Sequence, residues 1–273
     1  MSPLISVDEL RECLDEVLVL DARWQLGRTD GREQYRAGHI PGAVFVDIES
    51  ELTRHGAPHE GRHPLPEDAD LAAAAKRWGL RAGVPVVVYD DARMLPASRT
   101  WWALRRAGVP ARVLDGGWQA WLSAGGEIET GEVVAADGDL ELAAPGDAGV
   151  IDTEAAARWP DTGVLLDARA PERYRGQSEP IDPVAGHIPG ARNLPIGRLL
   201  GDDGRFLPAS DLAAAFDEAE AREGTAIAAY CGSGITAAQL ALAGEIIGRD
   251  VTVYPGSWSA WSNTPGRLVA LGD

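Results

Sequence analysis

The segment best suited to chemistry begins at Cys231 and continues as Gly232, Ser233, Gly234, Ile235 and Thr236. An apolar run ends just before the cysteine and a helix-forming run follows it, so a strand is predicted to pass into a helix here. The glycines allow the backbone to curl with its amide N–H groups pointing inward, and a helix N-terminus adds about half a positive charge. Both effects favour a thiolate over a thiol. The segment is therefore predicted to hold a nucleophilic sulfur with an anion beside it.

A buried structural cysteine followed by a tight turn is the alternative that involves no chemistry. Among reactions, a phosphatase of the Cys-x5-Arg type needs an arginine at the position that Ala237 occupies, and without it the phosphate has no cationic clamp. Sulfur transfer needs backbone donors for an anionic persulfide but no arginine inside the loop. The segment therefore favours sulfur transfer.

The elements that must position this cysteine occur twice in the chain. Three motifs recur in the same order at similar spacing, which indicates two homologous halves and not a solenoid. We predict an N-terminal domain over residues 1–124, a linker over 125–149 that is rich in Gly, Asp, Glu and Ala, and a C-terminal domain over 150–273. The paired motifs are 18–23 with 164–169, 38–43 with 186–191, and 113–121 with 253–261.

Each half alternates short apolar runs with helix-forming segments. This order is typical of βαβ units and predicts an α/β fold with a mainly parallel sheet in each half. Ligands of such sheets bind beyond the carboxyl ends of the strands, where the Cys231 segment lies. The predicted strands are 17–20, 85–89, 164–166 and 226–230, and the predicted helices are 68–78, 98–107, 209–221 and 236–247.

Composition narrows the range of partners. The net charge is −17, which disfavours nucleic acid and anionic membrane surfaces. The chain has a single lysine, Lys76, so a cation that binds an anionic substrate is expected to be an arginine. The chain has no run of 18 or more apolar residues, its first residues are not expected to form a secretory signal, and the two cysteines exclude a disulfide framework. These features predict a cytoplasmic protein.

No metal or other cofactor is predicted. His55, His59 and His63 have the spacing of one helical face, but the glycines and prolines among them disfavour a continuous helix. His39 and His187 occupy matching turns in both halves, including the half without a cysteine at the corresponding position. We therefore interpret these two histidines as structural.

The repeated Gly-His-Ile-Pro-Gly-Ala, the Asp-Gly-Gly-Trp motif at 115–118 and the Cys-Gly-Ser-Gly-Ile-Thr segment resemble those of tandem-domain rhodaneses. The cysteine segment is most similar to that of 3-mercaptopyruvate sulfurtransferases. The resemblance covers nearly the whole chain. It implies two rhodanese-like domains, each a mainly parallel sheet flanked by helices on both faces, with the site at their interface. Asp90 stands where the N-terminal domain would carry its cysteine, so the resemblance implies that this domain is non-catalytic.

The resemblance also implies roles for single residues. Arg173 matches the family's arginine for the anionic substrate, whereas Ile181 stands where a second arginine is common. Ser233, His63 and Glu49 match a proton relay, with glutamate in place of the usual aspartate. The alternatives are that Arg173 is a solvated surface charge, that Ser233 only satisfies loop amides, and that His63 is a polar loop residue.

Together these observations predict an enzyme that moves sulfane sulfur from 3-mercaptopyruvate to a thiol such as thioredoxin, or to cyanide, through a Cys231 persulfide. Arg173 is expected to bind the small anionic donor. The alternatives are a thiosulfate sulfurtransferase, which the neutral Gly232-Ser233 side of the loop disfavours, and a non-enzymatic persulfide carrier. The backbone amides expected to stabilise the sulfur anion are those of Gly232, Gly234, Ile235 and Thr236.

Overall fold

The computed structural model describes residues 2–144 and 149–273, which divide into two compact units. Within the described part, the first unit contains residues 2–54, 66–144 and 203–205, and the second contains 55–65, 149–202 and 206–273. Two short segments, 55–65 and 203–205, thus belong to the unit opposite to the one expected from the repeat. Residues 55–65, which carry His63, pack with the second unit.

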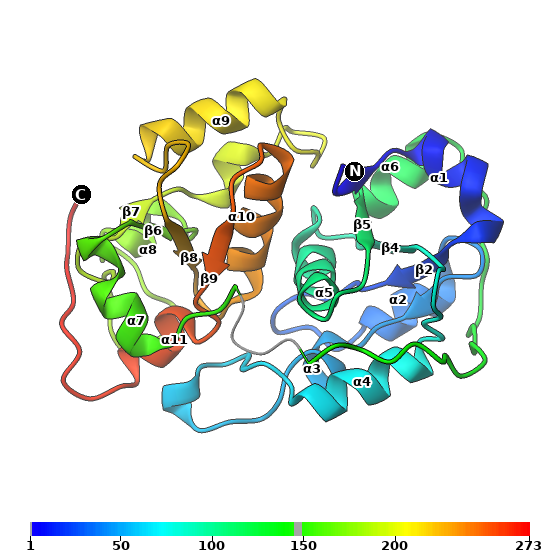
Figure 1. Ribbon diagram of the computed structural model, residues 1–273, viewed down its shortest axis with the longest axis horizontal. Coiled ribbons are helices and arrows are strands. Elements are labelled where there is room, and N and C mark those ends of the chain that lie inside the picture. Colours follow the sequence, from blue (N-terminus) through cyan, green and yellow to red (C-terminus); the bar gives the residue numbers. More distant parts are fainter. Residues whose placement is uncertain (1, 145–148) are drawn as a thin grey trace. The chain divides into compact units, whose positions relative to one another are not determined.

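The first unit is built on a five-stranded parallel sheet of order β1-β5-β4-β2-β3. The helix α5 lies against β4 and β5 (Figure 1). The strands are β1 (Leu4–Ile5), β2 (Leu18–Asp21), β3 (Val44–Phe45), β4 (Val86–Tyr89) and β5 (Ala111–Leu114). The helices are α1 (Val7–Cys13), η1 (Leu14–Glu16), α2 (Gly31–Ala37), α3 (Ile48–Glu51), α4 (Asp68–Arg77), α5 (Leu95–Arg106) and α6 (Gly117–Ser123).

The second unit is built on a four-stranded parallel sheet of order β7-β6-β8-β9. The helix α10 packs on β8 and β9 (Figure 1). The strands are β6 (Val164–Asp167), β7 (Arg192–Asn193), β8 (Ile227–Tyr230) and β9 (Val251–Val253). The helices are η2 (Pro58–Glu60), α7 (Thr153–Arg158), η3 (Trp159–Asp161), α8 (Pro171–Tyr174), η4 (Ile196–Leu199), α9 (Ala209–Glu218), α10 (Ile235–Ile246) and α11 (Ser257–Ser262). The predicted α/β class with parallel sheets is confirmed.

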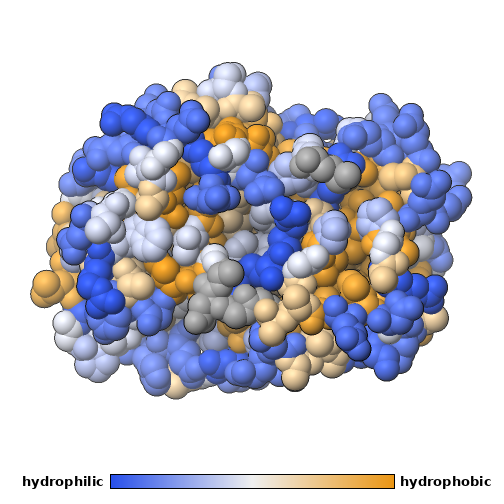
Figure 2. All heavy atoms as spheres, in the orientation of Figure 1, coloured by the Kyte–Doolittle hydropathy of each residue, from blue (hydrophilic) through white to orange (hydrophobic). Residues whose placement is uncertain are grey.

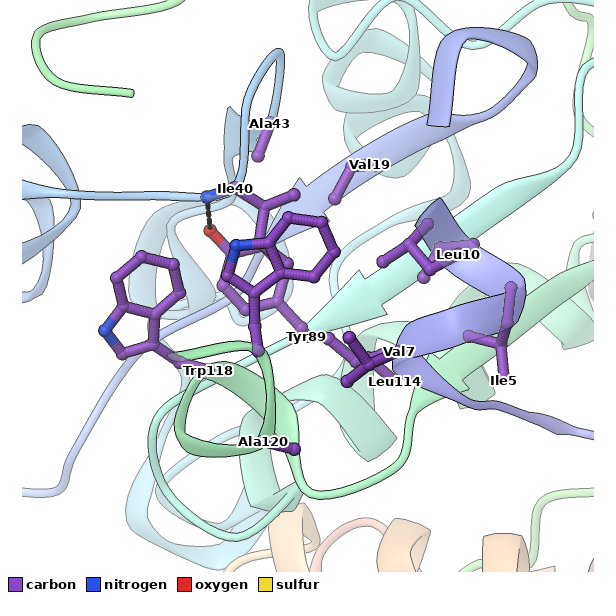
Figure 3. Close-up of a cluster of buried hydrophobic side chains, with 12 residues drawn as sticks. Ile5, Val7, Leu10, Val19, Ile40, Ala43, Tyr89, Leu114, Trp118 and Ala120 are labelled. Carbon is purple, nitrogen blue, oxygen red and sulfur yellow. Dashed lines mark hydrogen bonds between the residues drawn. The ribbon is translucent and has the colours of Figure 1, made fainter. Parts of the chain in front are cut away.

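Apolar side chains from the sheet and its helices form the core of each unit. In the first unit, Leu10 and Val19 pack with Tyr89 and Trp118 (Figure 3). The Tyr89 hydroxyl accepts a hydrogen bond from the Ile40 N–H at 3.1 Å, so the buried ring also fixes the Gly-His-Ile-Pro-Gly turn. The Tyr230 hydroxyl accepts the same bond from the Ile188 N–H in the second unit. Each core thus has its own tyrosine at the end of an interior strand, and the two tyrosines have the same role.

In each unit, a buried ion pair lies at the end of the strand that pairs with the tyrosine's strand. Arg23 Nη2 lies 2.6 Å from Asp21 Oδ2, and Arg169 Nη2 lies 2.6 Å from Asp167 Oδ2. Each guanidinium also donates to the carbonyl of the glycine that opens the Gly-His-Ile-Pro-Gly turn. A buried charge is retained where it is paired and hydrogen-bonded in this way, so the repeated Asp-Ala-Arg motif has a structural role.

The predicted linker is partly ordered against the first unit. Glu129 pairs with His39 as an antiparallel bridge, and the Asp139 N–H donates to the Leu80 carbonyl at 3.0 Å. The final part of the linker, residues 145–148 with Pro145 and Gly146, lies outside the described residues. No helix in the described ranges is long and apolar enough to cross a membrane. Hydrophilic side chains cover much of the face shown in Figure 2, in keeping with the charge of the chain.

Candidate active site

Cys231 follows β8 directly, and α10 begins four residues later at Ile235. Its Sγ accepts a hydrogen bond from the Gly234 N–H at 3.1 Å, and the cysteine is 2% exposed. Gly234 has a φ of +87°, and a β-carbon there would lie 2.5 Å from the Pro255 carbonyl oxygen. Only glycine fits both conditions. The loop therefore curls over the sulfur, as the sequence indicated.

The first turn of α10, which begins four residues after the cysteine, contains further amide donors. The N–H groups of Ile235 and Thr236 lie in this turn, where a helix has no internal acceptors for its amides. Gly232 and Ser233 complete the loop between strand and helix. The four backbone amides predicted from the sequence therefore belong to one strand-to-helix turn, and their role toward a bound sulfur anion remains a prediction.

The last motif of the repeat, residues 253–261, forms hydrogen bonds with the backbone of the cysteine loop. The Trp258 N–H donates to the Cys231 carbonyl at 2.9 Å, and the Ser259 N–H donates to the Gly232 carbonyl at 2.9 Å. The Ser257 hydroxyl accepts from the Cys231 N–H at 3.1 Å. Both backbone groups of the nucleophile and the carbonyl of the next residue are thus satisfied within the second unit, which keeps the loop in one conformation.

The corresponding loop of the first unit has similar backbone support but carries Asp90 in place of the cysteine. The Trp118 N–H donates to the Asp90 carbonyl at 2.8 Å, just as Trp258 does for Cys231. The Asp90 carboxylate accepts from the N–H groups of Ala92, Met94 and Ala97 at 2.6, 3.0 and 2.8 Å. Burial raises the pKa of Asp90 to about 6, although these amide hydrogen bonds act in the opposite direction. The carboxylate of Asp90 thus accepts from three backbone N–H groups that follow it in the chain.

Arg173 lies in α8 with its guanidinium beside the cysteine loop. A β-carbon placed on Gly232 would lie 3.3 Å from Arg173 Nη1. Two carboxylates orient the group: Nη2 lies 2.6 Å from Glu179 Oε1 and 3.1 Å from Asp182 Oδ2. Arg173 is therefore not a solvated surface charge, and it stands next to the residue that follows the nucleophile.

Arg62 is a second guanidinium at this position, and the sequence reasoning missed it. Its Nη2 would lie 3.1 Å from the same added β-carbon on Gly232, and its Nη1 forms an ion pair with Asp182. The sequence signal was its place next to His63. Burial raises the pKa of Asp182, whereas the neighbouring guanidinium of Arg62 lowers it. Ile181, the expected place of a second arginine, is 45% exposed.

The structure brings Ser233 and His63 together. His63 Nδ1 lies 2.7 Å from Ser233 Oγ, and both residues are buried in the second unit. Glu49 belongs to the first unit, where its Oε1 accepts a hydrogen bond from the Trp24 Nε1–H at 2.7 Å. The serine–histidine pair is thus formed, and the relay as a whole stays a prediction.

The two histidines of the repeated turns have the same environment. The His39 and His187 rings stack on Tyr35 and Tyr174, with centroids 4.2 and 3.8 Å apart. Each Nδ1 lies within hydrogen-bonding distance of the backbone carbonyl of its tyrosine. Burial lowers the pKa of His187, which favours the neutral ring. These contacts support their interpretation as structural residues.

A cavity of about 530 Å³ lies next to the paired arginine and aspartate in the second unit. Its lining includes Arg62, Asp182, Ile181, His55 and Asn263. The site thus combines a buried thiol, a helix N-terminus, two guanidinium groups and a serine–histidine pair near one strand end. Such an arrangement can bind a small anion and present a sulfur nucleophile to it.

Comparison with known proteins agrees with this chemistry. The rhodanese-like domain family matches residues 6–124 and again residues 152–264. A protein of Mycobacterium tuberculosis strain H37Rv named as a thiosulfate sulfurtransferase is 48% identical over 261 residues, covering 94% of this chain and 92% of that protein. The 3-mercaptopyruvate sulfurtransferase of Escherichia coli K12 is 33% identical over 267 residues, covering 94% of each.

Solved structures give the same relationship. The crystal structure of SseA from Escherichia coli superposes with a TM-score of 0.84 at 31% identity, covering 94% of this chain and 99% of that one. The 3-mercaptopyruvate sulfurtransferase of Leishmania major superposes with a TM-score of 0.85 at 28% identity, covering 94% of this chain and 73% of that one. The chain therefore belongs to the rhodanese family, as a sulfurtransferase made of two rhodanese-like domains.

Proposed function

We propose that this sulfurtransferase takes a sulfane sulfur from 3-mercaptopyruvate onto Cys231 and passes it to a thiol. The observation that carries the choice of donor is the hydrogen bond between Ser233 Oγ and His63 Nδ1, two residues from the nucleophile. Cleavage of mercaptopyruvate leaves an enolate that must gain a proton, and a serine–histidine pair can hold and move one. Thiosulfate releases sulfite and has no such need.

The first half-reaction balances without a co-reactant. The Cys231 thiolate attacks the sulfur of the donor, an S–S bond forms, and the C–S bond breaks with its electron pair moving onto carbon. The resulting enolate takes a proton and leaves as pyruvate, while the donor's thiol proton is lost from the outer sulfur. The Gly234 N–H, already directed at Sγ, and the first turn of α10 stabilise the persulfide anion.

The second half-reaction restores the cysteine. An acceptor thiolate attacks the outer sulfur, the S–S bond of the persulfide breaks, and Cys231 leaves as a thiolate. With a dithiol acceptor such as thioredoxin, the second thiol then releases sulfide and forms a disulfide; cyanide gives thiocyanate directly. This cycle needs a reduced thiol at every turn, which suits the cytoplasm predicted from the sequence.

Thiosulfate is the second candidate donor, and one observation favours it. The loop side chains after Cys231 are uncharged, but Arg62 and Arg173 bring two guanidinium groups to Gly232 from outside the loop. A dianion is better served by two cations than by one. The name of the Mycobacterium tuberculosis relative points in the same direction.

The test compares the two donors with one enzyme preparation. Pyruvate release from 3-mercaptopyruvate and thiocyanate formation from thiosulfate and cyanide are measured, and kcat/KM is compared. The proposal requires a higher value for 3-mercaptopyruvate. A higher value for thiosulfate would assign the second candidate, and a single loading of sulfur with no turnover for either donor would leave a persulfide carrier.

A further inference from the structure

Two guanidinium groups converge on the residue that follows the nucleophile, and they come from distant parts of the sequence. Arg62 Nη2 and Arg173 Nη1 would lie 3.1 and 3.3 Å from a β-carbon on Gly232. The absence of a side chain at Gly232 leaves this space open to both. Two like charges at such short range repel each other unless an anion lies between or beside them.

Asp182 supplies that anion in the structure. Its Oδ1 pairs with Arg62 Nη1, and its Oδ2 lies 3.1 Å from Arg173 Nη2. The aspartate side chain is only 1% exposed, whereas those of Arg62 and Arg173 are 26% and 19% exposed. Glu179 Oε1 accepts from the Asp182 N–H at 3.1 Å and fixes the loop. The buried carboxylate therefore binds one nitrogen of each guanidinium. The other terminal nitrogen of each, Arg62 Nη2 and Arg173 Nη1, lies near Gly232.

Arg62 also has hydrogen-bonding capacity that the protein does not use. Its Nε is buried and has no hydrogen-bond partner among the residues that the structure describes. The same side chain lines the 530 Å³ cavity, together with Ile181 and Asn263. A buried donor without an acceptor is unfavourable, so the described residues alone do not satisfy this guanidinium.

We infer that Arg62 is a second anion-binding residue of the site, and that it and Arg173 together bind the charged group of the sulfur donor. This inference rests on the proposed function for the identity of the anion. The cavity beside Arg62 gives the non-reacting end of the donor a place to lie, while Gly232 allows that end to approach both guanidinium groups. Asp182 is a positioning residue that orients the pair.

The competing explanation is that Arg62 only neutralises Asp182, and substitutions separate the two. Arg62→Gln removes the donor-binding charge and leaves Asp182 without that partner, whereas the double variant Arg62→Gln/Asp182→Asn also removes the carboxylate that Arg62 would have neutralised. If Arg62 binds the donor, Arg62→Gln raises KM by roughly 10- to 100-fold with little change in kcat. Arg62→Lys recovers part of that loss, and the KM of the double variant stays raised because the donor-binding charge is still missing.

The control is Arg198→Gln, which removes an exposed arginine of the second unit that pairs with Glu218. It is expected to keep the KM of the wild-type enzyme. Melting temperatures of all variants show whether a change in KM reflects loss of structure. An unchanged KM in Arg62→Gln, or a KM that returns to the wild-type value in the double variant, would overturn the inference.

A binding measurement keeps the inference separate from the reaction. In a Cys231→Ser background, calorimetry gives the Kd of 3-mercaptopyruvate and of thiosulfate with and without Arg62→Gln. A weaker Kd on loss of Arg62 supports the inference even if the wild-type enzyme turns over neither donor, in which case only the proposed function fails. Equal Kd values with and without Arg62, in an enzyme that does turn over, overturn the inference alone.

Discussion

Ser233 Oγ and His63 Nδ1 form a 2.7 Å hydrogen bond across 170 residues of sequence. The bond exists because residues 55–65 pack with the second unit and not with the half of the chain in which they occur. Helix α11 lies against η2 in this segment, and the Arg62 N–H donates to the Ser259 hydroxyl. The segment 55–65 thus places both His63 and Arg62 beside the cysteine loop.

Ser233→Ala is expected to separate the two donors. A proton is needed only when the C–S bond of 3-mercaptopyruvate breaks, so kcat/KM for that donor should fall by roughly 100- to 10,000-fold while that for thiosulfate changes little. Steady-state kinetics with both donors measure this. The double variant with His63→Gln should be no worse than the single variants, because the two residues act as one pair. An equal loss for both donors would show that Ser233 only supports the loop.

Gly234→Ala is expected to destabilise the protein and lower activity. The left-handed backbone costs a non-glycine residue about 1–2 kcal/mol, and the added carbon would also meet the Pro255 carbonyl at 2.5 Å. Gly224→Ala is the matched control, because its φ of +78° carries the same backbone cost but nothing lies within 4 Å. Chemical denaturation should therefore show a larger loss of unfolding free energy for Gly234→Ala. Equal losses would mean that the contact with Pro255 relaxes without effect.

Asp90 is expected to make the stability of the first unit depend on pH. Its pKa is raised to about 6 by burial, whereas an unfolded aspartate titrates near 3.9. The folded state therefore retains a proton that the unfolded state loses between these values, so stability falls as pH rises from about 4 to about 6, by about 3 kcal/mol, and then levels off. Denaturation at several pH values should show this slope in the wild-type protein and not in Asp90→Asn.

The control for this prediction is Asp91→Asn, which changes the exposed neighbouring carboxylate and should keep the slope of the wild-type protein. A slope that persists in Asp90→Asn would assign the pH dependence to another group. A wild-type stability that rises from pH 4 to 6 would show that the three amide hydrogen bonds outweigh burial at Asp90.

Local sequence patterns were sufficient to predict the parallel sheets and the strand-to-helix position of Cys231. The glycine requirement at Gly234 and the buried tyrosine before the cysteine are encoded within a few residues. The helix predicted over 98–107 begins earlier, at Leu95. It follows directly on Arg93 and Met94, whose positive φ angles turn the chain into the helix. Such strain in non-glycine residues leaves no clear signal in the sequence.

Arg62 could not be found in the same way. Its importance depends on an ion pair with Asp182 that spans 120 residues, and on the packing of residues 55–65 with the second unit. The resemblance directed attention to the loop before the second Gly-His-Ile-Pro-Gly, where Ile181 stands. Only the folded chain shows that a guanidinium reaches Gly232 from a different segment.

The most direct test of the account is the mass of the intact protein after treatment with donor in the absence of an acceptor. The wild-type protein should gain one sulfur atom, located on Cys231 by peptide mapping, and lose it when a thiol is added. Cys13→Ser should gain it as well, because Cys13 lies in the first unit and its Sγ is hydrogen-bonded to the Glu9 carbonyl. Cys231→Ser should gain none and should not turn over. Sulfur found on Cys13, or turnover that survives Cys231→Ser, would contradict the assignment of Cys231 as the nucleophile.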